Sequence, residues 1–439
     1  MFALNHENTR KLHIPMISGV LSLFGYIYLS INSQAYGQLS LWQFYLVMTS
    51  CAIISAVLWL YYQQRNEEPS LWLLVGFAIV FRIVGVFAFP VLEDDFYRYL
   101  WDGRTVIEYG SPYELAPSHF FSSLSISDRF DDILGLINYP DIPTIYGPVN
   151  QWVFALAYII APGEIWPLQV FYALVDLLII IVLLKLARPN MVLLYAWSPL
   201  IIKEFAFTAH PDVLGALLLL IAFVLYRKAS YSTAAIALAL AAGVKIFALL
   251  LVPFFLGAQW RAWIVFGTSI ILIGAPWGVL ETWLPHGLSA MGSAWVFNAP
   301  LYLLFEPILS FVNIKIILLS IMFISCLLYY LYCMKHWPKH EIRGDYLFML
   351  LLICSPVLNP WYLVWLLPFA TIYPSVWAWV ASVSILLSYS SGINLNHSEL
   401  TGYDIEPWII TIEFLSIVLI PSLLSYKTSY PEFRLNRKI

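Results

Sequence analysis

Three consecutive carboxylates, Glu93, Asp94 and Asp95, follow the third long apolar run of the sequence. Like charges this close repel one another, so their pKa values shift unless a cation or an arginine neutralises them. A carboxylate with a shifted pKa at a membrane surface can act as a general base toward a hydroxyl group. The alternative is a solvated acidic loop. Arg98 and Arg104 follow closely in the sequence and favour a functional site over that alternative.

A second cluster of ionisable residues lies within an apolar stretch and comprises Lys203, Glu204, His210 and Asp212. Ionisable side chains at membrane depth are costly and are usually functional. The alternative to a functional role is that Lys203 and Glu204 form an ion pair and neutralise each other. His210 and Asp212 fit that alternative less well, so we expect them to contribute to a site.

Two further cations stand within apolar segments. Lys245 separates the short apolar pieces 232–243 and 246–257. A lysine in that place is a suitable counter-charge for a lipid phosphate, although it could instead extend to the membrane interface. Arg82 lies inside the third apolar run, where it either pairs with an acid in the helix bundle or reaches the site.

Aromatic and amide residues near the ends of the late apolar runs form a weaker signal. Trp283, His286, Trp295 and Asn298 could stack against a sugar, and an ordinary interfacial aromatic belt explains them equally well. The segment 359–362, Asn-Pro-Trp-Tyr, predicts an interruption at the end of a helix.

The composition identifies the elements that must position these residues. Of the 439 residues, 61% are hydrophobic and 11% are charged, whereas soluble domains carry roughly 25% charged residues. Repeated apolar runs of about 20 residues predict membrane-spanning helices, since backbone groups in lipid must pair within their own segment. The net charge of −4 excludes a nucleic-acid-binding surface. Motifs for nucleotide binding, nucleophilic serine and helical zinc sites are absent from the sequence, so nucleotide sugars and ATP are not expected as substrates.

The positions of the apolar runs predict a polytopic bundle. The expected spans cover about 13–31, 41–62, 71–90, 166–187, 191–208, 211–226, 261–280, 313–334, 375–391 and 408–427. Shorter apolar pieces cover 149–161, 232–243, 246–257, 345–358 and 360–373. Gly or Pro interrupts several of these pieces, which indicates half-helices or re-entrant turns that face protein or a water-filled cavity.

Basic residues predict the orientation, because Lys and Arg are enriched in cytoplasmic loops. If all basic clusters are cytoplasmic, the N-terminus is cytoplasmic and the stretches 91–148, 281–312 and 392–407 are extracytoplasmic. This orientation also requires that 149–161 does not cross the membrane fully. The clusters are Arg10/Lys11, Arg65, Lys185/Arg188, Arg227/Lys228, Arg261, Lys335/Lys339/Arg343 and the basic residues from Lys427 to Lys438.

At these residues the chain resembles the integral-membrane GT-C glycosyltransferases, and within them the bacterial mannosyltransferases that use polyprenyl-phosphate mannose. The likeness covers roughly residues 90–260. Its most specific part is the acidic motif at 93–104 followed by Gly-Ser-Pro-Tyr at 110–113; the C-terminal third is similar in hydropathy alone. Further matching pieces are Pro-Asp-Ile-Pro-Thr-Ile-Tyr-Gly-Pro at 140–148, Glu204 with His210 and Asp212, and Lys245.

The resemblance implies a GT-C-like, all-α membrane protein with about 12–14 membrane helices. Residues 1–439 would form one transmembrane domain, with a catalytic loop at 91–148 that carries short amphipathic helices and a second extracytoplasmic loop at 281–312. It also implies a bacterial plasma-membrane location and an extracytoplasmic active site.

The resemblance further implies a polyprenyl-phosphate sugar as donor and a lipid, glycan or protein as acceptor, with inversion of the anomeric centre. The general base of the family maps to Asp95, judged by its distance from Pro112 and Tyr113, and Asp94 is its rival. We expect no cofactor and no metal. The residues expected to bind substrate are Glu93, Arg98, Arg104, Tyr146, Glu204, His210, Asp212 and Lys245.

Two other functions fit parts of the pattern. A transporter or flippase would also use broken helices and intramembrane charges, but it predicts pseudo-symmetric halves, which the sequence does not show. A ligase for lipid-diphosphate oligosaccharides would favour arginines in the late extracytoplasmic loops, and 281–312 and 392–407 contain none.

Overall fold

The computed structural model of the chain describes residues 6–34, 39–121, 127–283, 295–309, 313–336, 341–391 and 405–425. These residues form helices and connecting segments, with no β-strand among them beyond an isolated bridge between Phe297 and Val357. The first half comprises α1 (His6–Asn32), α2 (Leu41–Arg65), α3 (Leu71–Val86), α4 (Asp95–Tyr109), α5 (Asp128–Gly135), α6 (Pro148–Ile160), α7 (Trp166–Leu186), α8 (Pro189–Ala196) and α9 (Pro199–Ile202).

The second half is also helical. It comprises α10 (Asp212–Arg227), α11 (Tyr231–Val244), α12 (Val252–Leu256), α13 (Trp260–Gly274), α14 (Val279–Trp283), α16 (Pro300–Phe305), α17 (Ile314–Lys335), α18 (Gly344–Cys354), α19 (Leu367–Ile372), α20 (Val376–Ser384) and α21 (Pro407–Ser425). Short 3₁₀ segments occur at 117–120, 246–251, 275–277, 360–365 and 385–391, and a π-helical turn occurs at 203–207.

The predicted class, an all-α polytopic membrane protein, is confirmed. Within the described residues, four helices are long and apolar enough to cross a bilayer: α1 from His13, α2, α7 and α17. A fifth is obtained if the bent pair Pro199–Phe207 and Asp212–Arg227 counts as one span. Seven shorter apolar helices of 10–17 residues are also present among the described residues, so the expected total of 12–14 membrane helices stays a prediction.

Several expected spans are interrupted in the structure. The run 191–208 is not one helix: α8 ends at Ala196, and the Ser198 side chain then accepts a hydrogen bond from the backbone N–H of Ile201 to begin α9, with Pro199 at its first position. A proline is tolerated there because the first backbone N–H groups of a helix have no intrahelical partner. The run 261–280 similarly ends its α-helix at Gly274, and 375–391 changes from α to 3₁₀ at Ile385.

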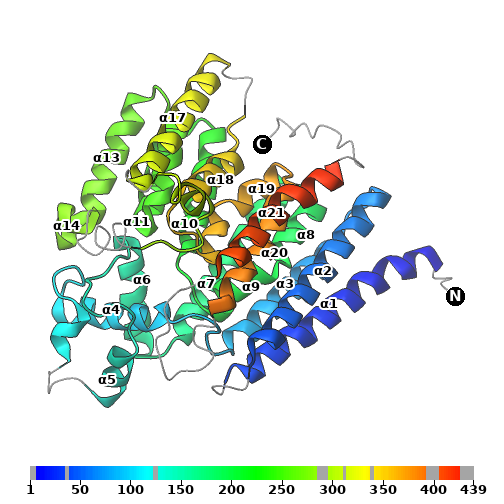
Figure 1. Cartoon of the computed structure of the whole chain (residues 1–439), viewed down its shortest axis with the longest axis horizontal. Helices are drawn as coiled ribbons and strands as arrows, with labels where there is room; N and C mark the ends of the chain where they lie inside the picture. The colour runs from blue at the N-terminus through cyan, green and yellow to red at the C-terminus, as the bar shows by residue number, and fades with distance from the viewer. Residues whose placement is uncertain are drawn as a thin grey trace.

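Three sets of neighbouring helices position the site and can be followed in Figure 1. Helices α1, α2 and α3 pack together, and α3 contacts α7, which in turn contacts α10. Helices α10, α11 and α13 follow in a row of contacts on the opposite side. Helices α4, α5 and α6, from the predicted catalytic loop and just after it, lie together at one end of the molecule, away from the start of α1 and the end of α2.

Two breaks between helices bring Asp212 and Lys245 close together. The π-helical turn ends at Phe207, and the chain then bends by 114° before α10 begins at Asp212; Ala209, within this bend, has a left-handed φ of 56°. Between α11 and the 3₁₀ turn that starts at Ile246, Lys245 has an extended backbone. Such irregular segments are costly and are commonly retained where a site needs them.

Candidate functional site

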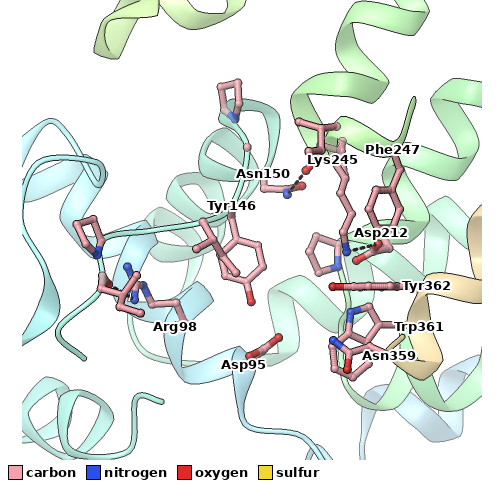
Figure 2. A pocket seen from close by; sticks show the side chains of 18 of the residues that line it. Asp95, Arg98, Tyr146, Asn150, Asp212, Lys245, Phe247, Asn359, Trp361 and Tyr362 are labelled. Carbon is pink, nitrogen blue, oxygen red and sulfur yellow. Dashed lines mark hydrogen bonds and ion pairs between the residues drawn. The ribbon is translucent and has the colours of Figure 1, made fainter. Parts of the chain in front are cut away.

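A cavity of about 200 Å³ lies where the α4–α6 group meets α10, α11 and the 360–365 turn. Its walls therefore come from several separate parts of the chain, and Figure 2 shows the cavity from close by. The polar and charged side chains that line it are Asp94, Asp95, Arg98, Asn138, Tyr139, Tyr146, Asn150, Asp212, Lys245, Thr282, Asn359 and Tyr362.

Asp95 begins α4 and lies at the floor of the cavity. Burial raises the pKa of Asp95 to about 7, and the nearby Glu93 carboxylate adds to this shift. His210, a hydrogen bond from the Tyr146 hydroxyl and the Lys245 ammonium act in the opposite direction and favour the carboxylate. A pKa near 7 places Asp95 in the range in which a general base is most effective at neutral pH.

The three consecutive carboxylates do not share one environment. Glu93 turns away from the cavity: its Oε1 atom accepts the backbone N–H groups of Asp94 at 3.1 Å and of Asp95 at 2.8 Å. Asp94 lines the cavity and accepts a short hydrogen bond from the Asn138 amide. Asp95 also lines the cavity, and Figure 2 shows its side chain beside Tyr146. The three carboxylates are thus separated by these hydrogen bonds to the backbone and to Asn138.

His210 lies directly behind the cavity floor. Its Nε2 atom is 2.8 Å from Oε2 of Glu93, and its Nδ1 atom is 3.1 Å from the Tyr99 hydroxyl. The imidazole also stacks on the indole of Trp361, with 3.9 Å between ring centroids and 16° between ring planes. His210 and Glu93 are 1% and 2% exposed, so both support the cavity from outside its lining and do not face a ligand.

Glu204 and Lys203 form a buried polar group one layer further from the cavity. The Lys203 ammonium is 3.2 Å from Glu204 and donates to the Tyr389 hydroxyl at 2.9 Å, and that hydroxyl hydrogen-bonds Glu204. Glu204 also lies 3.7 Å from Nε2 of His210. Lys203 therefore neutralises Glu204, which was one of the two alternatives considered from the sequence. Glu204 does not line the cavity.

Lys245 and Asp212 occupy the opposite wall. The ammonium of Lys245 lies 2.8 Å from Oδ1 of Asp212 and 3.7 Å from the centre of the Tyr362 ring. The same Asp212 oxygen accepts the indole N–H of Trp365 at 2.7 Å. Lys245 keeps 23% of its side chain exposed, so its ammonium can reach a ligand in the cavity while it stays fixed in place. Figure 2 shows this wall facing Asp95.

A close backbone contact holds the two walls together. The amide of Asn150 in α6 donates to the carbonyl oxygen of Val244 at 2.9 Å. A Cβ atom on Gly147 would lie 2.2 Å from the carbonyl oxygen of Gly243, so only a glycine permits this approach. The break before α6 and the end of α11 are thereby locked in the geometry that places Lys245 on the cavity.

The three arginines considered from the sequence have different surroundings. Arg98 lines the cavity and is held by Asp102 at 2.8 Å and by the Ile142 carbonyl at 2.9 Å. Arg104 lies outside the cavity lining and pairs with Glu108 at 2.7 Å. Arg82 pairs with Asp176 in the helix bundle at 2.6 Å. Of the two alternatives considered for Arg82, the structure therefore shows the pairing with an acid.

Residues that were not singled out from the sequence complete the site. Tyr99, Trp361 and Tyr362 contact His210 or Lys245, although the sequence indicated only a helix interruption at 359–362. Tyr99 stands one helical turn after Asp95, on the same face of α4, and that spacing was the available signal.

The second predicted loop also reaches the cavity. Trp283 and Trp295 line it, and the Asn298 amide donates to the Glu413 carboxylate of α21 at 3.1 Å. His286 and residues 392–404 lie outside the described residues.

Among the described residues one group offers metal-ligand geometry, since atoms of Glu93, Asp95 and His210 lie within 4.8 Å of one another. Glu93 and His210 are already hydrogen-bonded to each other, so a cation would have to displace that bond.

A comparison with known protein families indicates which class of reaction the chain catalyses. Residues 20–262, more than half of the chain, match the family described as alpha-(1→6)-mannopyranosyltransferase, N-terminal domain. The chain belongs to this family. The matched range contains Glu93 to Lys245 and therefore most of the cavity. No curated protein and no solved structure gives a significant match. Membership of this mannosyltransferase family makes the chain a glycosyltransferase, with a sugar donor and an acceptor, and favours that activity over transport.

Proposed function

We propose that the protein transfers a mannosyl group from a polyprenyl-phosphate donor to a hydroxyl of a glycan, lipid or protein acceptor on the extracytoplasmic face. The observation that carries this proposal is that Asp95 and Lys245, from distant parts of the chain, line one cavity. A base and a cation on opposite walls are what a sugar transfer from a phosphate leaving group requires.

Asp95 is the proposed general base. The acceptor hydroxyl must lose its proton as its oxygen attacks the anomeric carbon, and Asp95 is the carboxylate on the cavity with a pKa raised to about 7. Asp212 also lines the cavity, but its Oδ1 atom is already bound by Lys245 and Trp365. With Asp95 as the base and no second carboxylate assigned as a nucleophile, the proposed reaction is a single displacement, which inverts the anomeric centre. Asp94 remains the rival base because it lines the same cavity.

Lys245 is the proposed contact for the leaving phosphate. Its ammonium has three donor hydrogens, and the contact with Asp212 uses one of them. The charge that develops on the phosphate oxygen is stabilised best by a cation that is fixed before the reaction begins. Next to Lys245, Ile246 and Leu249 are each 42% exposed and apolar, which suits the lipid part of a polyprenyl donor.

The proposed orientation of the chain in the membrane is supported by contacts at the end of the molecule opposite the α4–α6 group. The Arg188 side chain bonds Glu68 at 2.7 Å, and the backbone N–H of Asn190 bonds the same carboxylate at 2.8 Å. The ends of α2 and α7, which carry basic residues, therefore meet on one side. The α4–α6 group lies away from that side in Figure 1, as expected if the cavity opens to the extracytoplasmic leaflet of a bacterial plasma membrane.

Incubation of the purified full-length protein with radiolabelled polyprenyl-phosphate mannose and a panel of acceptors tests this function. We expect labelled mannose to move to at least one acceptor, and the Asp95→Asn variant to leave the donor intact. If no acceptor leads to consumption of the donor by the wild-type protein, the proposal is wrong. Analysis of the product linkage for α or β configuration tests inversion separately.

A further inference from the structure

Two consecutive aromatic side chains line the cavity next to Lys245. They are Trp361 and Tyr362, and both belong to the 3₁₀ turn Pro360–Trp365. The centre of the Tyr362 ring lies 3.7 Å from the Lys245 ammonium. The rings of Trp361 and Tyr362 meet nearly at right angles, at 88°, with 6.0 Å between their centroids. Figure 2 shows Tyr362 between Lys245 and Trp361.

Trp361 also reaches the side of the cavity on which Asp95 lies. Its indole stacks on the imidazole of His210, with 3.9 Å between ring centroids. A ring nitrogen of His210 and a carboxylate oxygen of Asp95 lie within 4.8 Å of each other. The two aromatic rings therefore extend along the cavity wall from Lys245, the proposed contact for the phosphate, to Asp95, the proposed base.

The indole of Trp361 is fixed relative to the ammonium of Lys245. On one face the indole rests on His210, which is 1% exposed and does not line the cavity. Further along the same 3₁₀ turn, the indole N–H of Trp365 donates to Oδ1 of Asp212 at 2.7 Å, and Lys245 donates to that oxygen at 2.8 Å. One carboxylate thus anchors both the turn that carries Trp361 and the lysine.

The proposed reaction determines where the transferred sugar must lie. In a single displacement the attacking and leaving oxygens stand on opposite sides of the anomeric carbon. With Asp95 at the attacking oxygen and Lys245 at the leaving phosphate, the sugar ring lies between these two side chains, in the space that Trp361 borders. A pyranose carries its hydroxyls around its edge and C–H groups on its faces. The negative face of an aromatic ring attracts such weakly positive groups.

We propose that Trp361 is the platform on which the transferred sugar packs, and that it recognises the sugar part of the donor. The proposal rests on the proposed function and adds the residue that holds the sugar in that reaction. His210 occupies one face of the indole, so the sugar packs against the opposite face. Trp361 takes part in no bond change: it places the anomeric carbon between Asp95 and the phosphate that Lys245 contacts.

The donor lipid with and without its sugar separates this role from a general effect on the cavity. Polyprenyl-phosphate mannose carries both the sugar and the phosphate, whereas polyprenyl phosphate lacks the sugar. Trp361→Leu removes the aromatic face and should weaken the binding of the mannosyl lipid alone. Lys245→Met should weaken the binding of both lipids, because both carry the phosphate. A substitution that merely distorted the cavity would also weaken both.

Trp59→Leu is the matched control. Trp59 is 8% exposed and Trp361 is 6% exposed, so the two substitutions remove indoles of similar burial. Trp59 belongs to α2 and does not line the cavity, and its indole nitrogen has no hydrogen-bond partner among the described residues. This variant should bind both lipids as the wild type does.

The test is equilibrium binding of the two radiolabelled lipids to the full-length protein in detergent, without an acceptor. We expect Trp361→Leu to bind polyprenyl-phosphate mannose roughly tenfold more weakly than the wild type does, with an unchanged affinity for polyprenyl phosphate. Trp361→Phe keeps a smaller aromatic ring and should show a smaller loss, again for the mannosyl lipid alone. It replaces Trp361→Leu in the test if that variant does not fold.

The possible outcomes separate the platform from the proposed function. An unchanged affinity of Trp361→Leu for the mannosyl lipid, an equal loss for both lipids, or the same loss in Trp59→Leu overturns the platform. If the wild type transfers mannose in any of these cases, the proposed function stands. If the wild type binds neither lipid and transfers no mannose, the proposed function fails and the platform falls with it. A loss confined to the mannosyl lipid, with no transfer to any acceptor, supports the platform and contradicts the proposed transfer.

Discussion

Lys245 and Asp212 form an ion pair on the cavity wall, with 2.8 Å between Nζ and Oδ1, and this pair fixes the one lysine that lines the cavity among the described residues. The Trp365 indole binds the same Asp212 oxygen at 2.7 Å, so the carboxylate is itself held in place. An ammonium on a flexible stem loses side-chain entropy when it binds a ligand. Here the ion pair and the Tyr362 ring, 3.7 Å away, have already restricted it.

Replacement of Lys245 by methionine should weaken donor binding and slow transfer. Hydrogen bonds to charged groups contribute about 1.5–3 kcal/mol, which corresponds to roughly a 10- to 100-fold loss in kcat/KM for the donor. Steady-state kinetics with a polyprenyl-phosphate sugar would measure this loss. Lys228→Met is the control, because Lys228 is exposed and follows α10 at the end opposite Asp212. Equal donor kinetics in the two variants would contradict the role of Lys245.

Asp95→Asn should reduce transfer by about 10²–10⁴-fold, the usual contribution of a general base, and leave the protein folded. Asp94→Asn should have a smaller effect, because Asp94 bonds Asn138 and an asparagine retains a carbonyl oxygen for that bond. Product formation per unit of folded protein compares the two variants directly. A loss in Asp94→Asn as large as that in Asp95→Asn would move the role of base to Asp94.

The transfer rate should rise with pH and reach half of its maximum near pH 7. Burial raises the pKa of Asp95 to about 7, and only the carboxylate form can accept the acceptor proton. Well below this pH the carboxylate fraction falls about tenfold per pH unit, so the rate should fall in proportion. A pH profile of kcat/KM for the acceptor would show this limb. A profile that is flat between pH 5 and 8 would exclude Asp95 as the titrating base.

The raised pKa of Asp95 also predicts that the stability of the folded protein depends on pH. The pKa of Asp95 is raised from 3.8 to about 7 in the folded protein, so the folded state retains a proton that the unfolded state releases. The resulting stability is fully present below pH 3.8 and is lost as pH rises through 7. Asp95→Asn cannot ionise. Its melting temperature in detergent should therefore exceed that of the wild type increasingly from pH 5 to pH 8, and a constant difference would contradict this.

The sequence was sufficient for the fold class because hydropathy reports burial in lipid directly. It also led us to expect Asp95 and Lys245 at one site, because the basic clusters predict which side of the membrane each segment faces. It did not predict the break within 191–208, because the apolar run continues through the interruption. Ser198 and Pro199, a helix-capping residue followed by a proline, were the local signal for it.

The interior of the site was less predictable. Glu93 is adjacent to Asp95 in sequence, yet its side chain turns to His210, 117 residues away, because its second oxygen binds the backbone at the start of α4. Sequence spacing cannot distinguish such a supporting carboxylate from a catalytic one. Trp361 was likewise interpreted as part of a helix interruption, and only its stacking on His210 reveals its place in the site.

Gly147→Ala should impair both the fold and the activity, because no side chain fits where α6 meets α11. The backbone of Gly147, with φ of −67°, suits any residue, so the effect is purely steric. An alanine Cβ would lie 2.2 Å from the Gly243 carbonyl oxygen, and a backbone atom cannot move aside cheaply. Overpacking of this kind typically costs about 1–3 kcal/mol.

The displaced segment would carry Lys245 with it, so donor KM should rise together with the loss of thermal stability. Gly135→Ala is the matched control, since a Cβ atom at Gly135 meets nothing within 4 Å. Thermal unfolding in detergent and donor kinetics should both be normal for that variant. If Gly147→Ala retained the melting temperature and donor KM of the wild type, the close contact between α6 and α11 would not be what positions Lys245.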